Sequence, residues 1–136
     1  MDITYQAEEN LQAEEFKALL IKSTLGERRP IDDIERIEKM CRNAGLIVTA
    51  RADGQLVGVA RSVTDWVYCT YLSDLAVDEA FQHRGIGKKL IAETKRLTPQ
   101  ATLILLAAPA AVGYYPKIGM TNHEHCYLLR DVNDLK

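Results

Sequence analysis

Two glycines and three basic residues gather in one short segment that could hold a phosphate group. Gly85 and Gly87 lie two apart, Arg84 precedes them, and Lys88 and Lys89 follow. The glycines leave room for a ligand close to the backbone. The amphipathic pattern that follows predicts a helix whose first N–H groups have no partner within the helix, and whose dipole places positive charge there. An anion would satisfy both, so the segment predicts a phosphate site.

The spacing of these residues excludes two common nucleotide-binding motifs. A P-loop requires G-x-x-x-x-G-K-[ST], whereas here the glycines are two apart and Lys88 is followed by another lysine. A dinucleotide fingerprint requires G-x-G-x-x-G directly after a strand, whereas position 90 is Leu90 and the apolar stretch ends at Val77. A purine nucleotide site is therefore disfavoured.

The segment resembles the Q/R-x-x-G-x-G/A signature of the GNAT superfamily of acetyl-CoA-dependent N-acetyltransferases, with Gln82-His83-Arg84-Gly85-Ile86-Gly87 as the matching residues. A second stretch, from Ala111 to Met120, is similar to the A-x-x-x-[FY]-Y-x-x-x-G-F segment of that family. Met120 departs from the usual aromatic residue, which affects packing more than chemistry. The resemblance covers about Ile3 to Arg130, in a single domain that we assign to residues 1–136.

The resemblance implies an α/β fold with a mixed, mostly antiparallel sheet, in which a central pair of parallel strands splays apart and helices flank the sheet. Acetyl-CoA would lie between those two strands, with its pantetheine arm along free backbone and its pyrophosphate at the helix start. An unpaired strand edge offers N–H and C=O groups to such an arm. The expected cofactor-binding residues are Leu75, Ala76, Val77, Gln82, His83, Arg84, Gly85, Ile86, Gly87, Lys88 and Lys89.

Two residues are candidates for catalysis. The resemblance implies that Tyr115 lies beside the CoA sulfur and protonates the departing thiolate. A phenol with a pKa near 10 suits proton donation to a thiol whose pKa is about 8.5. The attacking amine must be neutral, and Asp74, three residues before Val77, is the best-placed carboxylate to bind or deprotonate it. The alternative roles are structural: a half-buried aromatic for Tyr115, and a cap or hydrogen bond for Asp74.

The acceptor side carries weaker signals. Trp66 and Tyr71 precede Asp74 and are candidates to line a substrate cleft, or to pack against the first helices. The charged connection Gly26–Pro30 could form a substrate-side rim or be solvated. His123 and His125 have no distant partner with metal-ligand spacing, so no metal is expected.

Composition is compatible with such an enzyme. The 136 residues are 47% hydrophobic and the formal net charge is −2, which suits one globular domain and gives no reason to expect nucleic acid or an anionic membrane as partner. Three cysteines without C-x-x-C spacing argue against disulfides and favour a reducing, cytoplasmic location. No apolar run approaches a membrane span of ~20 residues. A homodimer is open, with 126–130 as a candidate edge strand.

Hydrophobic periodicity and turn residues predict the elements that would position these groups. Asp53-Gly54 predicts a hairpin turn, and Pro30 suits the first turn of a helix. The expected strands are 3–6, 46–52, 55–62, 70–77, 102–107 and 126–130, and the expected helices are 8–21, 31–43, 85–97 and 109–117.

These observations predict an N-acetyltransferase that moves an acetyl group from acetyl-CoA to a primary amine of a small molecule or peptide, by direct attack in a ternary complex. The alternative is a non-catalytic acyl-CoA-binding module that senses the cofactor or scaffolds a partner. Retention of Tyr115 and Asp74 favours the enzyme. The acceptor is not identified by any pattern in the chain.

Overall fold

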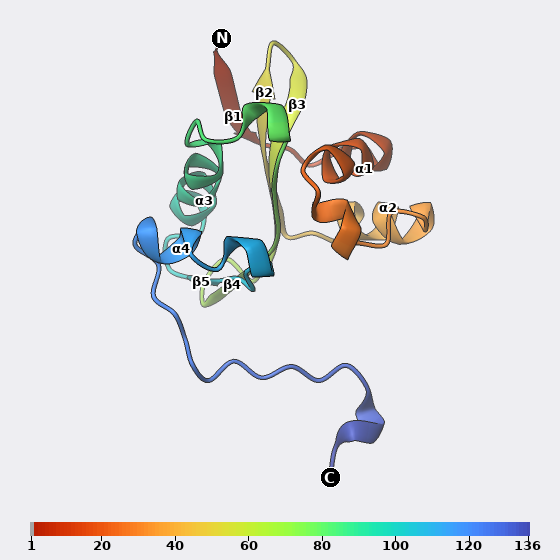
Figure 1. Ribbon diagram of the computed structural model, residues 1–136, viewed down its shortest axis with the longest axis vertical. Coiled ribbons are helices and arrows are strands. Elements are labelled where there is room, and N and C mark those ends of the chain that lie inside the picture. The colour runs from red at the N-terminus through yellow and green to blue at the C-terminus, as the bar shows by residue number, and fades with distance from the viewer. Residues whose placement is uncertain (1) are drawn as a thin grey trace. The chain divides into compact units, whose positions relative to one another are not determined.

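The computed structural model describes residues 2–136 and divides the chain into two compact units, the first ending at Leu106 and the second running Ala107–Lys136 (Figure 1). Each unit is described by itself. The single-domain assignment therefore stays a prediction. Within residues 2–136, none of the helices is long and apolar enough to cross a bilayer.

The first unit is built on a five-stranded sheet in the order β1-β2-β3-β4-β5. Neighbouring strands are antiparallel except β4 and β5, which are parallel. The mixed, mostly antiparallel α/β fold is thus confirmed, although the parallel pair lies at one side of this sheet and not at its centre. The strands are β1 Ile3–Ala7, β2 Leu46–Ala52, β3 Gln55–Thr64, β4 Cys69–Val77 and β5 Thr102–Ile104.

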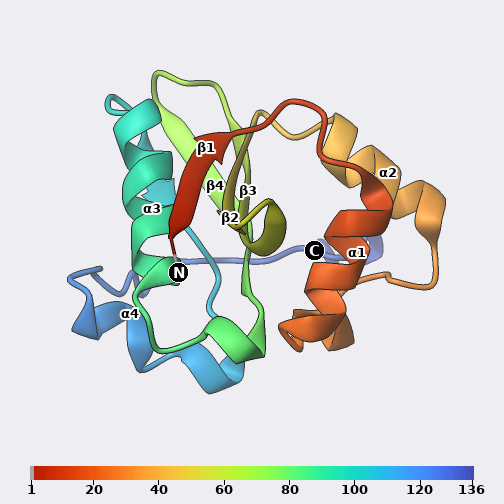
Figure 2. The ribbon, with the colours of Figure 1, turned by 90° about the horizontal axis from the view of Figure 1, so that it is seen from above.

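Helices cover both faces of the sheet (Figure 2). Helices α1, Ala13–Lys22, and α2, Ile34–Arg42, pack on one face around Phe16, Leu20 and Ile37. Helix α3, Ile86–Leu97, packs on the other face through Ile86 and Leu90. A 3₁₀ turn, η1 Leu25–Arg28, follows α1, and another, η2 Glu79–Phe81, follows β4. The chain therefore crosses from β4 to β5 through α3, as the sequence predicts.

The β2–β3 hairpin matches its prediction. Asp53 and Gly54 adopt positive φ angles of 49° and 86°. Two successive residues in this conformation match the twist of a two-residue hairpin, and Asp-Gly is a preferred pair for it.

The first two helices begin later than predicted. Residues 8–12 are not helical because Glu8 extends the pairing of β1, its N–H donating to the carbonyl of Ile47 at 2.9 Å. Helix α2 begins after Asp33, whose carboxylate caps it by accepting from the N–H of Arg36. Pro30 lies in the turn before the helix, and not in its first turn as predicted.

Gly58 on β3 lets α3 approach the sheet closely. A Cβ atom at Gly58 would lie 3.0 Å from Cδ1 of Leu90 and 3.1 Å from Cγ2 of Ile86. These contacts are tighter than ordinary packing, so a Cβ atom here would require the Leu90 and Ile86 side chains to shift. Gly58 therefore helps to position the helix start that the sequence predicts as a phosphate site.

An ion-pair cluster joins β1, β2 and α1. The Arg51 guanidinium donates to Glu8 at 2.8 Å and to Glu15 at 2.7 Å, and Thr49 donates to Glu8. The hydrogen bonds from Arg51 and Thr49 outweigh burial and hold the pKa of Glu8 at about 2. These carboxylates also raise the pKa of Arg51.

Because the pKa of Glu8 is lower in the folded chain than the ordinary value of 4.5, its contribution to stability is complete above pH 4.5 and is lost as pH falls toward 2. We expect Glu8→Gln to remove about 1–3 kcal/mol of stability at pH 7 and to flatten the wild-type loss of stability across this range. Urea unfolding at several pH values checks this, with Glu9→Gln, at an exposed neighbour, as control. Parallel wild-type and Glu8→Gln profiles would contradict it.

The second unit contains short helices: η3 Pro109–Ala111, α4 Tyr114–Lys117 and η4 Val132–Asp134. Helix α4 ends in a Schellman turn, in which the N–H of Met120 donates to the carbonyl of Tyr115 at 3.0 Å and the N–H of Gly119 donates to that of Pro116 at 3.1 Å. Gly119 has a φ of 99°, which explains why this position favours glycine.

Two predicted strands differ in the structure. The strand expected at 126–130 is not formed, since the structure assigns no strand there and exposes Tyr127, Leu128 and Leu129. Its residue types suit a strand, but a strand also requires a neighbour for its backbone groups. The strand expected at 102–107 ends at Ile104, and its outward residues Ile104 and Leu106 are about half exposed.

Candidate active site

The connection from β4 to α3 forms a tightly organised loop. The N–H of Asp78 donates to the carbonyl of Val57 at 2.8 Å, which fixes the end of β4 against β3. The Asp78 carboxylate accepts from the N–H of Ala80 at 2.9 Å, and Gln82 Nε2 donates to the carbonyl of Val77 at 3.1 Å. Gln82 therefore closes the turn with its side chain, a role that the sequence did not predict.

Left-handed backbone brings the loop into α3. His83 has a φ of 66°, and Gly85, the residue that caps α3, has a φ of 79°. A Cβ atom at Gly85 would meet nothing within 4 Å, so the backbone there faces open space. The N–H groups of the first turn, from Ile86 onward, lack partners within the helix and can donate hydrogen bonds to an anion.

The basic side chains of this loop lie at the surface, where they could reach a phosphate. Arg84 stacks on the Phe81 ring with its guanidinium carbon 5.2 Å from the ring centre, and Lys89 Nζ lies 5.5 Å from the centre of the Tyr5 ring. Ile86, in contrast, is buried in the core, so only its backbone is available to a ligand. The sequence therefore predicted the turn into a helix at this place, but it did not separate the side-chain groups from the backbone groups that a ligand could reach, and the cofactor role of these residues stays a prediction.

Strand β4 has an unpaired edge that leads to this loop. It pairs with β5 only from Cys69 to Tyr71, and β5 ends at Ile104. In the described part of the chain, no strand pairs with Leu75–Val77 on that side. Leu75 and Val77 pack toward α3 while Ala76 packs toward α1 and α2, so the backbone alone is available at this edge. This geometry fits an extended ligand arm that ends at the connection from β4 to α3, which we call the phosphate loop after its predicted role.

A β-bulge in β4 decides which face Asp74 occupies. Arg61 pairs with Asp74 and Ser62 pairs with Leu72, so Ser73 has no partner residue on β3. Leu72 consequently packs on the α3 face and Ala76 on the opposite face, although four residues separate them. In a regular strand these two side chains would share one face. Asp74 therefore lies on the face of α1 and α2.

On this face, Asp74 is held by two arginines. Arg29 Nε donates to one carboxylate oxygen and Arg61 Nε donates to the other. The Asp74 side chain has no exposed surface, and those of Arg29 and Arg61 are 21% and 10% exposed. Both oxygens thus have cationic partners inside the protein. This arrangement corresponds to the structural alternative for Asp74, and its catalytic role stays a prediction.

Neither arginine was singled out from the sequence. Arg61 did carry a signal, because it is a charged residue within a long buried strand, and buried charges require partners. Arg29 had no such signal, since it belongs to a charged loop connection whose residues could equally be solvated.

The predicted substrate residues lie toward the other end of β4. Trp66 is in the β3–β4 hairpin with a φ of 73° and is 45% exposed, and Asp65 stabilises this turn by accepting from three backbone N–H groups. Tyr71 is half-buried within β4. The strand is about 26 Å long, so the hairpin and the phosphate loop are at opposite ends of it. The role of Trp66 and Tyr71 in substrate binding stays a prediction.

Tyr115 belongs to the second unit, on α4. Its ring contacts that of Tyr114 edge to face, with 5.2 Å between the ring centres. Burial, and to a lesser extent Tyr114, raises the pKa of Tyr115 above the ordinary value of 10. The phenol therefore keeps its proton at neutral pH, as a proton donor must.

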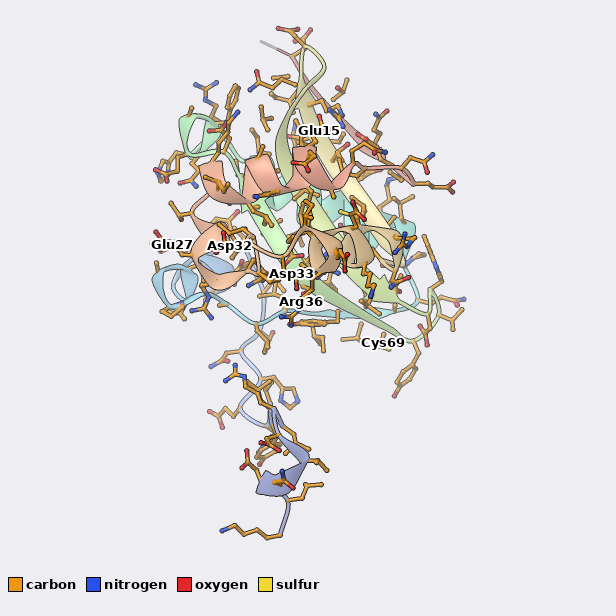
Figure 3. All side chains as sticks on the ribbon, turned by 90° about the vertical axis from the view of Figure 1, so that its right-hand side faces the viewer. Glu15, Glu27, Asp32, Asp33, Arg36 and Cys69 are labelled. Atoms are coloured by element: carbon orange, nitrogen blue, oxygen red, sulfur yellow. The ribbon has the colours of Figure 1, made fainter. Side chains whose placement is uncertain are left out.

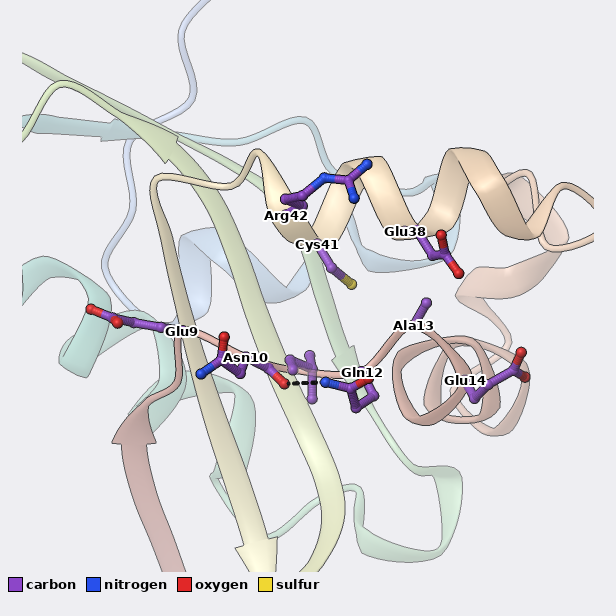
Figure 4. Close-up of a pocket in the computed structure, with 9 residues that line it drawn as sticks. Glu9, Asn10, Gln12, Ala13, Glu14, Glu38, Cys41 and Arg42 are labelled. Atoms are coloured by element: carbon purple, nitrogen blue, oxygen red, sulfur yellow. Dashed lines mark hydrogen bonds between the residues drawn. The ribbon is translucent and has the colours of Figure 1, made fainter.

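A pocket of about 350 Å³ lies between the segment before α1 and the end of α2 (Figure 4). Its lining comes from residues 9–14 and from Glu38, Cys41 and Arg42, so the predicted site residues lie elsewhere. Burial raises the pKa of its Cys41 thiol to about 11, which keeps the thiol protonated and unreactive.

Among residues 2–136 no group of three His, Cys, Asp or Glu side chains could hold a metal ion.

The model of the acetyltransferase (GNAT) family matches residues 9–120. The chain belongs to the GNAT family. This assignment agrees with the unpaired β4 edge and with the glycine-bearing turn into α3, and the matched GNAT region spans both units.

GNAT-family relatives are found by sequence and by structure. The chain is 27% identical over 125 residues to an uncharacterized N-acetyltransferase of Pyropia yezoensis, covering 87% of this chain and 70% of that protein. A GNAT-family acetyltransferase from Streptococcus pneumoniae is 22% identical with a TM-score of 0.77, covering 96% of this chain and all of that one. An aminoglycoside N-acetyltransferase in complex with CoA is 18% identical with a TM-score of 0.74, covering 96% and 95%. At these identities the solved structures establish the fold.

Proposed function

We propose that this GNAT-family protein is an N-acetyltransferase that transfers an acetyl group from acetyl-CoA to a primary amine of a small molecule or peptide. The observation that carries this proposal is the unpaired edge of β4 at Leu75–Val77, which runs directly into the glycine-bearing start of α3. An extended amide-containing arm followed by a pyrophosphate matches that order of groups. The structural relative bound to CoA supports it.

In the proposed complex, main-chain groups of Leu75, Ala76 and Val77 pair with the pantetheine arm. The first-turn N–H groups of α3, from Ile86 and Gly87, and the exposed basic side chains hold the pyrophosphate. Gln82 keeps the turn closed by its hydrogen bond to Val77. The basic side chains are those of His83, Arg84, Lys88 and Lys89.

The proposed reaction is direct attack by a neutral amine on the thioester carbonyl in a ternary complex. The nitrogen–carbon bond forms and the carbon–sulfur bond breaks. The proton of the attacking amine passes to water, and Tyr115 donates its phenolic proton to the leaving thiolate and regains a proton from solvent. We assign Asp74 a positioning role in place of the proton-acceptor role, because both of its oxygens are held by arginines.

Trp66 and Tyr71 remain the residues that we propose to contact the acceptor amine. No metal takes part, and we propose a cytoplasmic location.

Release of free CoA from acetyl-CoA across a panel of amines, detected with a thiol reagent, tests this function. The panel contains an aminoglycoside, a polyamine, amino acids and a lysine peptide. Amine-dependent release would support the enzyme. Tight acetyl-CoA binding without release would support instead the non-catalytic module, which the buried ion pairs of Asp74 favour because they occupy one of two candidate catalytic groups.

The phosphate loop makes a separate prediction for cofactor binding. We expect Gly85→Ala to weaken acetyl-CoA binding about 10-fold, because a side chain disfavours the φ of 79° by about 1–2 kcal/mol and the loop would shift. Isothermal titration calorimetry measures this. Gly54→Ala is the matched control, since Gly54 has a φ of 86°, equally open surroundings, and a place in the β2–β3 turn. Equal acetyl-CoA affinities for both variants would contradict the prediction.

A further inference from the structure

The Ser73–Asp74 peptide in the β4 bulge is held by the connection between α1 and α2. Arg29 lies in this connection, directly after η1, and its Nη2 donates to the carbonyl of Ser73 at 2.8 Å while its Nε donates to the Asp74 carboxylate. Arg29 Nη1 donates to the carbonyl of Arg28 at 2.9 Å, within the connection itself. One guanidinium thus joins this connection, marked in Figure 3 by Glu27, Asp32 and Asp33, to a single peptide of β4.

Arg61 holds the side chains of the bulge from the neighbouring strand. Its Nη2 donates to Ser73 Oγ at 3.1 Å and its Nε to the other oxygen of Asp74. The third contact of the Arg61 guanidinium is with the carbonyl of Met40, whereas the Arg29 guanidinium donates to the Ser73 carbonyl itself. The two guanidinium groups therefore contact the bulge differently: that of Arg61 binds its side chains, and that of Arg29 also binds its backbone.

The direction of this peptide matters for the strand that follows. In a planar trans peptide the C=O and the next N–H point in opposite directions, so the hold of Arg29 on the Ser73 carbonyl also orients the N–H of Asp74. The pairing of β4 with β5 ends at Tyr71, so this peptide already belongs to the unpaired edge, which continues through Leu75–Val77. A rotated peptide would misdirect the first hydrogen-bonding groups of that edge.

We infer that Arg29 is a positioning residue, which orients the Ser73–Asp74 peptide and couples the α1–α2 connection to the strand edge that carries the thioester. This inference rests on the proposed acetyl-CoA site at that edge. Lysine cannot replace Arg29, because an ammonium group cannot donate to the Ser73 carbonyl and the Asp74 carboxylate with the geometry of the planar guanidinium.

Hydrogen exchange tests the hold on the peptide without any acceptor. In Arg29→Lys we expect the amides of residues 73–77 to exchange at least about 10-fold faster than in wild type. Without the hydrogen bond from Arg29 to the Ser73 carbonyl, this part of β4 opens locally more often. Arg96→Lys is the matched control, since Arg96 lies on the exposed side of α3 and pairs only with Glu93. Added acetyl-CoA should protect residues 74–77 in wild type and protect them less in Arg29→Lys. Arg29→Gln provides a second variant if Arg29→Lys does not fold.

Kinetics then separate positioning from binding and from folding. At temperatures well below the Tm of each variant, we expect Arg29→Lys to lower kcat about 10- to 100-fold with an acetyl-CoA Kd within about 3-fold of wild type. Wild-type exchange and wild-type kcat in Arg29→Lys would overturn the inference, as would a matching loss in Arg96→Lys. If wild type releases no CoA with any amine, the proposed function fails, and the protection of 74–77 by acetyl-CoA alone decides the role of Arg29.

Discussion

Replacement of Asp74 by asparagine is expected to lower the free energy of unfolding by about 3 kcal/mol. The Asp74 side chain has no exposed surface and accepts hydrogen bonds from Arg29 and Arg61 on its two oxygens. An asparagine amide retains one acceptor oxygen but presents a donor to the other guanidinium. Two largely buried positive charges would then remain without a counter-charge, which is the costly way to break a buried ion pair. Urea unfolding measures the loss.

Asp53→Asn is the matched control, because Asp53 is exposed in the β2–β3 turn and asparagine also suits that turn. It should change stability by less than about 0.5 kcal/mol. The two roles of Asp74 then separate in one variant. If the role of Asp74 is structural, Asp74→Asn loses stability, and its folded fraction keeps the wild-type pH dependence of turnover. Wild-type stability together with a missing pH-rate limb would identify Asp74 as the base and contradict our assignment.

Replacement of Tyr115 by phenylalanine is expected to lower kcat about 100-fold with little change in acetyl-CoA affinity. The change removes the phenolic proton but keeps the ring and its contact with Tyr114. Because burial raises the pKa of Tyr115, the wild-type rate should fall only when pH rises above 10, where the phenol loses its proton. Turnover at saturating substrates and the acetyl-CoA Kd are the measurements.

Tyr127→Phe serves as the control for this prediction, since Tyr127 is 86% exposed in the same unit. It should leave both kcat and Kd unchanged. Turnover of Tyr115→Phe equal to that of wild type at saturating substrates and at every pH would exclude proton donation by this phenol. A large rise in the acetyl-CoA Kd would instead identify Tyr115 as a binding residue.

Several elements were predictable because the residues that form them are close in sequence. The Asp53-Gly54 turn follows from two residues that tolerate positive φ. The turn into α3 follows from Gly85 at the helix start and from a helix whose large apolar residues Ile86, Leu90, Ile91 and Leu97 pack on the sheet. Local conformational preference and periodicity decide such features, and neither depends on distant contacts.

Other predictions were wrong where a distant partner decides the structure. Residues 8–12 have a helical pattern, but pairing of Glu8 with β2 and the Arg51 ion pairs hold the start of this segment extended. Residues 126–130 have strand-forming residue types, yet the structure assigns no strand there. Strand propensity describes a fit to a neighbouring strand, and the pattern of one segment cannot supply that neighbour.

Asp74 shows most clearly where prediction from sequence ends. Alternation places it opposite Leu75 and Val77, and the structure confirms this. Its partners, however, lie 45 and 13 residues away along the chain, and one unpaired residue, Ser73, sets the face on which it meets them. The residues from Val77 to Lys89 predict a cofactor loop because the groups that could bind the cofactor are contiguous in the sequence. The environment of Asp74 arises from long-range packing, so only the folded chain shows that two arginines hold this carboxylate.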